Sequence, residues 1–144
     1  MKIYTDTSVL VSLYITDANS PRADAWRQKY LAPLEFSGLH RLELRNAMSL
    51  AVFQQRLTPA ESQAAWQGVQ QDLSAGILMP RITMWGKLLR EAEDLAEHQT
   101  PTIGARSLDI LHVAAALVEG ATVFCTFDTR QAKLAQLPGL HVQP

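Results

Sequence analysis

The sequence has little cysteine and no excess of charge of either sign. Cys125 is the one cysteine among 144 residues, which excludes an intramolecular disulfide framework and a cysteine-rich zinc site and favours a reducing, cytosolic setting. The 13 lysines and arginines nearly balance the 14 aspartates and glutamates, so the net charge is -1. A protein with this balance does not hold a polyanion through its overall field, and any such contact must be local.

Long hydrophobic runs are also absent. The apolar stretch at residues 8–15 is too short to cross a bilayer, and it is closed by Asp17. No cationic segment followed by a long apolar one opens the chain, so we expect no signal peptide, no anchor and no membrane contact. With 47% hydrophobic and 19% charged residues, the chain is predicted to form a single domain over residues 1–144 with a sizeable core.

Short apolar runs alternate with longer periodic ones, and this alternation predicts an α/β fold with a mostly parallel sheet flanked by helices. Strands are expected at residues 2–5, 34–37, 77–82, 121–127 and 140–142. Helices are expected at residues 7–14, 20–30, 39–51, 58–75, 84–97, 107–119 and 128–136.

Local signals set several of these boundaries. Ser20 is predicted to cap a helix whose first position is Pro21. Thr58 and Pro59 open another helix with the pattern of a capping box. Pro101 and the residues around it predict a loop.

Two acidic residues follow buried strands directly, Asp6 after the first strand and Asp128 after the strand at residues 121–127. Residues at the carboxyl ends of parallel strands line the ligand crevice of such sheets. The alternative for each residue is an N-cap of the helix that follows.

Two further acids lie on predicted helices. Asp109 falls in a first turn, where the helix dipole by itself stabilises a negative charge. Glu43 borders an apolar stripe, where burial without a partner is costly, although a surface position at the edge of the stripe is also possible. A cluster of three or four such acids is one way to hold Mg²⁺ or Mn²⁺, which prefer oxygen ligands.

Without a metal, such a cluster would be unstable. Two carboxylates about 5 Å apart repel by about 3 kcal/mol at an effective dielectric of about 20. The acids must therefore protonate in part, bind cations, or lie apart, and spacing alone does not choose among these outcomes.

Four stretches resemble the motifs of PIN domains. They are IYTDTSVL at residues 3–10, LELRNA at 42–47, SLDILHVAAA at 107–116 and TFDTR at 126–130. All four occur in the family's order and extend over nearly the whole chain. The chain is most similar to the VapC-type toxins of bacterial toxin–antitoxin pairs, which it resembles in size and in the lack of extra domains.

The resemblance implies a three-layer PIN-like fold and a site at the carboxyl ends of the strands. Asp6, Glu43 and Asp109 map onto metal-binding acids, and Asp128 onto a fourth that binds metal directly or through water. The implied activity is hydrolysis of single-stranded or structured RNA with Mg²⁺ or Mn²⁺. The implied partners are a cognate antitoxin and a second copy of the chain, in the cytoplasm.

We expect the hydroxyls of Ser8 and Thr126 to hold the carboxylates or waters of this site. Basic residues near the motifs are candidates for RNA phosphate contacts, or are simply solvated surface cations. They are Arg41, Arg45, Arg106, Arg130 and Lys133. His112 is predicted as a core histidine, and Trp66 as a buried or interface side chain rather than a base-stacking one.

Self-association has mild support from the first predicted helix. Its apolar side chains are more numerous than one buried face requires. They are Val11, Leu13, Tyr14 and Ile15.

Two other functions share part of this pattern. A phosphotransferase of the haloacid dehalogenase type also begins with an aspartate after its first strand, but it needs a second aspartate two residues on, where this chain has Ser8. A catalytically inactive PIN-like module that binds RNA or protein is the other alternative.

Overall fold

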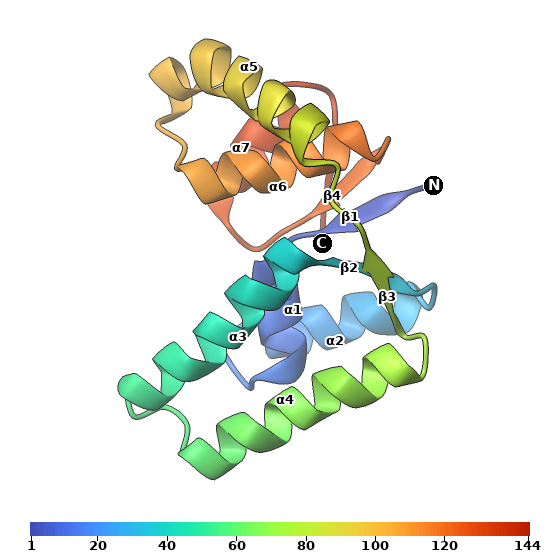
Figure 1. The fold of residues 1–144 in the computed structure, drawn as a ribbon, viewed down its shortest axis with the longest axis vertical. Helices are drawn as coiled ribbons and strands as arrows, with labels where there is room; N and C mark the ends of the chain where they lie inside the picture. Colours follow the sequence, from blue (N-terminus) through green and yellow to red (C-terminus); the bar gives the residue numbers. More distant parts are fainter. The chain divides into compact units, whose positions relative to one another are not determined.

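Every strand pairing in this chain is parallel, as the alternation of strands and helices predicts. The computed structural model describes residues 1–144, with seven helices and five strands of three or four residues each (Figure 1). The chain divides into two compact units, one made of Met1–Asp6 with Thr83–Pro144 and the other of Thr7–Ile82. None of the helices combines the length and apolar character that a membrane-spanning segment needs.

The first unit is a three-stranded parallel sheet with three helices. The strands are β1 (Ile3–Thr5), β4 (Val123–Cys125) and β5 (His141–Gln143), and the helices are α5 (Trp85–Ile103), α6 (Ser107–Val118) and α7 (Thr129–Gln136). The strand order is β1-β4-β5, with Thr5 opposite Cys125 in the register. β4 is therefore central, and burial of all three of its residues matches the apolar run that predicted it.

The core of this unit joins the sheet to the helices. Tyr4 of β1 stacks on Phe124 of β4 with ring centroids 5.6 Å apart. Both rings belong to a hydrophobic cluster with buried side chains of α5, α6 and α7. Among these are Leu88, Leu95, Ile110, Val113 and Leu134.

The prediction that Pro101 lies in a loop is wrong. α5 continues through Ile103 and contains Pro101 in its last turn. Ile103 packs against the hydrophobic cluster, and the helix ends at Gly104, whose φ of 68° gives the left-handed conformation of a C-cap. Tertiary packing thus outweighs the hydrogen bond that a proline cannot donate.

The second unit contains a two-stranded parallel sheet and four helices. The strands are β2 (Leu34–Ser37) and β3 (Leu78–Arg81), and the helices are α1 (Thr7–Tyr14), α2 (Ser20–Lys29), α3 (Gly38–Phe53) and α4 (Pro59–Ser74). The α3 helix begins at a reciprocal cap, in which Ser37 accepts from the His40 amide and the His40 ring accepts from the Ser37 amide. Thr58 caps α4 as predicted, by accepting a bond from the Glu61 amide at 3.1 Å.

Ser20 does not cap α2 as predicted. The N-cap is Asn19, and it makes no side-chain capping bond. The Ser20 hydroxyl instead donates to the Ser12 carbonyl at 2.7 Å and accepts from the Asp17 amide at 2.9 Å. It ties the loop between α1 and α2 to the end of α1.

Cys125 lies on β4 with no exposed surface. Burial, and to a smaller extent the Asp6 carboxylate, raises the pKa of its thiol to about 12. We therefore expect no reaction with a thiol reagent at pH 8 in the native state and one reacting thiol per chain in guanidinium chloride. Native protein that reacts as fast as free cysteine would contradict this placement.

Candidate functional site

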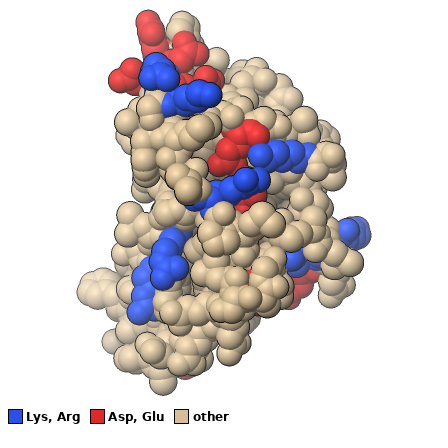
Figure 2. Space-filling model, turned by 45° about the vertical axis from the view of Figure 1, so that its right-hand side comes forward, with Lys and Arg blue, Asp and Glu red and all other residues tan.

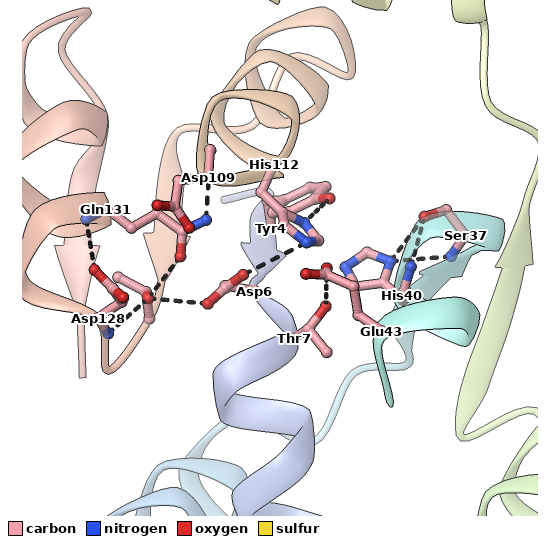
Figure 3. Close-up of polar contacts among 11 residues, drawn as sticks. Tyr4, Asp6, Thr7, Ser37, His40, Glu43, Asp109, His112, Asp128 and Gln131 are labelled. Atoms are coloured by element: carbon pink, nitrogen blue, oxygen red, sulfur yellow. Dashed lines mark hydrogen bonds and ion pairs between the residues drawn. The ribbon is translucent and has the colours of Figure 1, made fainter. Parts of the chain in front are cut away.

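Asp6 lies directly beyond β1 and is 5% exposed. Its amide donates to the Cys125 carbonyl at 2.8 Å, which continues the pairing with β4 by one residue. Its carboxylate oxygen Oδ2 accepts a hydrogen bond of 3.1 Å from the hydroxyl of Thr126, the residue that follows β4. The predicted juxtaposition of the two strand ends is therefore present in the first unit (Figure 3).

The Thr126 hydroxyl links three groups of the site. Besides Asp6, it contacts the Asp128 amide at 3.0 Å and the Gln131 side-chain amide at 3.0 Å. A hydroxyl has one proton to donate and two lone pairs that accept. Because the proton goes to Asp6, both other contacts must be donors to Thr126. This requires the Gln131 nitrogen, not its oxygen, to face the hydroxyl.

In that orientation Gln131 also donates to Asp6 Oδ2 at 2.7 Å. The opposite orientation would set an amide oxygen against the carboxylate and leave only a 3.4 Å contact from the nitrogen to the Asp109 carbonyl. Gln131 is 2% exposed, so this bond lies in a buried, low-dielectric environment. Hydrogen bonds to a charged group contribute about 1.5–3 kcal/mol each.

Asp128 is both a helix cap and a neighbour of Asp6. Its Oδ1 accepts from the Gln131 amide of the first turn of α7 at 2.9 Å, so the capping alternative holds. Its backbone amide donates to the Thr126 hydroxyl, which in turn donates to Asp6. Its second carboxylate oxygen, Oδ2, makes no hydrogen bond. Capping therefore leaves one carboxylate oxygen available to a ligand.

Asp109 lies in the first turn of α6, as predicted, with its side chain 15% exposed. Its Oδ2 faces the Arg106 guanidinium at 3.5 Å, and its Oδ1 makes no hydrogen bond. Arg106, predicted as an RNA contact, is thus beside an acid of the site.

His112 is buried, as predicted, and it faces Asp6. Its Nδ1 is 2.8 Å from the Tyr4 hydroxyl, and its Nε2 is 3.7 Å from Asp6 Oδ1. If the Tyr4 hydroxyl donates, the ring is the tautomer with its proton on Nε2, directed at the carboxylate. Tyr4 and His112 thus form the core side of the site beside Asp6.

Glu43 belongs to the second unit. Its Oε1 accepts a hydrogen bond of 2.9 Å from the hydroxyl of Thr7, the first residue of α1. Thr7 follows Asp6 in the chain. Ser8 is the next residue of α1, and its carbonyl accepts from the Ser12 hydroxyl. That Glu43 and Ser8 act together with the aspartates stays a prediction.

The remaining predicted cations lie on two helices. Arg41 and Arg45 are exposed on α3, over the ring of Trp66 of α4. Arg130 and Lys133 are exposed on α7.

The donor set fits a hard divalent cation. The three aspartates of the first unit supply only oxygen ligands, and Asp109 and Asp128 each keep one unbonded carboxylate oxygen. The structure has no group of three or more histidines, cysteines or acids arranged to hold a metal. Because Mg²⁺ is usually held by one or two carboxylates together with water and substrate phosphate, the residues present suit that ion rather than a closed cage.

The sequence reasoning missed Gln131 and Tyr4. Gln131 occupies the third position after the Asp128 cap, where a glutamine is common for reasons of capping alone. Tyr4 lies in the first predicted strand, where an aromatic residue is expected simply as part of the core. Neither position carries a local signal of a polar role, because Asp6, the partner of Gln131, and His112, the partner of Tyr4, come from distant parts of the chain.

Solved structures with the same fold as this chain include two proteins of low sequence identity. FitAcB from Neisseria gonorrhoeae is 20% identical, with a TM-score of 0.70 over 99% of this chain and 96% of that one. VapC20 of Mycobacterium tuberculosis, described as a sarcin-ricin loop cleaving toxin, is 17% identical, with a TM-score of 0.69 over 99% of each chain. No curated protein matches the sequence.

The model of the PIN domain family matches residues 3–137. That span contains all four stretches whose resemblance suggested the family, and the buried Asp6 and its partners at the ends of β1 and β4. The chain belongs to the PIN domain family.

Proposed function

We propose that this chain is a divalent-metal-dependent endoribonuclease and the toxin of a toxin–antitoxin pair. The observation that carries the proposal is the buried Asp6 carboxylate directly beyond β1. It accepts a hydrogen bond from the hydroxyl of Thr126, directly beyond the paired strand β4, and the same hydroxyl accepts a bond from the Asp128 amide. Burying a carboxylate is costly unless it is compensated, and structural stability alone would favour an apolar residue there. Asp6, Asp109, Asp128 and Glu43 are the proposed metal-binding and catalytic acids.

The chemistry of these residues suits phosphodiester hydrolysis. A divalent ion supplies Lewis acidity, activating water near neutral pH and stabilising charge on the leaving oxygen. The protein's part is to hold the Asp6 carboxylate in place through hydrogen bonds from Thr126 and Gln131. The free oxygens of Asp109 and Asp128 extend this set of ligands.

The proposed partners follow from the family and from VapC20. We propose an RNA substrate, single-stranded or structured, a cognate antitoxin and a homodimer. The first helix is a weak basis for the dimer, because Ile15 is buried and Val11, Leu13 and Tyr14 are half-buried in the monomer. The proposed location is the reducing cytoplasm, where a lone thiol stays free.

The first test replaces a proposed catalytic acid without changing its shape. We expect Asp6→Asn and Asp109→Asn each to slow cleavage of a defined RNA by about a hundredfold or more, the loss typical for removal of a group that stabilises developing charge. Both variants should stay folded in chelator, because removing one negative charge from the site lowers repulsion. The measurement is a gel-based cleavage rate with Mg²⁺ or Mn²⁺ beside a melting curve. Asp24→Asn, at an exposed position of α2, is the matched control. Parent-like cleavage by Asp6→Asn would overturn the proposal.

The second test measures metal binding without catalysis. An ion that binds only the folded state at about 100 times its Kd adds about 2.7 kcal/mol of stability, a rise of several degrees in Tm for a chain of this size. We expect this rise for the parent in Mg²⁺ or Mn²⁺ but not for Asp109→Asn, with ionic strength held constant by NaCl. Equal shifts in the two proteins would show that the ion binds elsewhere.

The third test concerns Gln131 as a positioning residue. Gln131→Met keeps the side-chain volume but removes the donor to Asp6. We expect the affinity for Mn²⁺, measured by calorimetry, to fall by about tenfold or more, as for other partners that orient metal ligands. Gln136→Met, an exposed position of the same helix, is the control. A fall in Tm with unchanged Mn²⁺ affinity would show that Gln131 is only structural.

A further inference from the structure

We propose that Arg41 and Arg45, held on the indole of Trp66, form a binding site for the phosphates of the RNA backbone. The site lies wholly in the second unit and uses none of the acids described above. The choice of RNA as its ligand rests on the proposed function.

The two arginines share one aromatic ring. Arg41 and Arg45 are four residues apart on α3, so they are neighbours on one face of the helix. Their guanidinium carbons are 5.0 and 4.9 Å from the ring centroid of Trp66 on α4. Cation–π contact restrains two side chains that are otherwise flexible, and it holds two like charges at adjacent positions.

Both guanidiniums keep their donors free. Neither makes a hydrogen bond or an ion pair in the structure, and Glu43, between them in sequence, bonds to Thr7 instead. Four other arginines are engaged by oxygen atoms: Arg27 by backbone carbonyls, Arg56 by Gln54, Arg81 by Glu35 and Arg106 by Asp109. Two adjacent cations with unused donors, preorganised and unpaired, are suited to an anion that accepts several hydrogen bonds at once.

The space beside the arginines fits a nucleotide. Arg41 and Arg45 line an open pocket of about 440 Å³ together with Gly38, Leu42 and Trp66. This volume is within the range of small-molecule sites and is larger than a lone carboxylate needs. Leu42, 68% exposed, offers apolar contact, and a guanidinium plane can stack on a base. Trp66 is only 9% exposed, so its part is to support the arginines rather than to stack on a base itself.

The distribution of charge favours a local site of this kind. Figure 2 shows a face on which lysine and arginine side chains form several small, separate groups, some of them beside acidic side chains. With a net charge of -1, the chain attracts RNA through such groups rather than through its overall field. The pair of arginines on Trp66 is one such local group.

The test is binding of a fluorescein-labelled, mixed-sequence single-stranded RNA of defined length, in buffer with EDTA so that no cleavage occurs. We expect Arg41→Gln/Arg45→Gln to raise the Kd for this RNA by about tenfold or more. The plot of log Kd against log salt concentration should become shallower by about one to two in slope, as expected for the loss of one or two phosphate contacts. Arg41→Lys/Arg45→Lys keeps the charge but loses the planar fork, and should restore only part of the affinity.

Arg56→Gln/Arg90→Gln removes the same charge from two other exposed positions and is the matched control. An equal loss of affinity in both double variants would overturn the proposal, because it would reflect net charge alone. So would unchanged RNA binding with weakened binding of a polyglutamate peptide, which would assign the pocket to an acidic protein segment.

Cleavage separates this proposal from the proposed function. Arg41→Gln/Arg45→Gln should raise the KM for RNA cleavage by about as much as it raises the Kd for RNA, whereas Asp6→Asn should bind RNA in EDTA and fail to cleave it. A parent that cleaves RNA with metal, while the double variant binds as tightly as the parent, overturns the binding site alone. A parent that neither binds nor cleaves RNA overturns both.

Discussion

The hydrogen bond from the Thr126 hydroxyl to the buried Asp6 carboxylate is the constraint on which the candidate site depends. It joins the residues that follow two paired parallel strands, and it holds the most buried of the three aspartates of the site. Since that hydroxyl has a single proton, its bond to Asp6 also sets the orientation of the Gln131 amide. One donor thus determines how the whole buried network is arranged.

The site reuses groups that local structure already requires. Asp128 caps α7 with one carboxylate oxygen and leaves the other unbonded, and Asp109 gains from the dipole of α6. A carboxylate near the N-terminus of a helix is stabilised by the helix itself, so an acidic site assembled there is less costly than one in the open core. The capping and the catalytic interpretations of these aspartates are therefore compatible.

Cations in this chain serve in two different ways. Arg106 lies beside Asp109 and offsets an acid of the site, whereas Arg41 and Arg45 have no acidic partner and rest on Trp66. A chain with almost no net charge has no general attraction for a polyanion. The proposed binding of RNA therefore depends on individual arginines whose donors the fold leaves free.

The alternation of strands and helices, the bounds of α1 and β2, the Asp128 cap and the family motifs are all predictable from the sequence. These follow from signals within a few residues: apolar period, caps and turn chemistry. That α5 runs through Pro101, that His112 and Gln131 face Asp6, and that Arg41 and Arg45 share Trp66 is visible only in the folded chain. Each of these features depends on contacts between separate segments, as does the hydrogen bond between Asp6 and Thr126, which are 120 positions apart, and no local sequence pattern encodes such contacts.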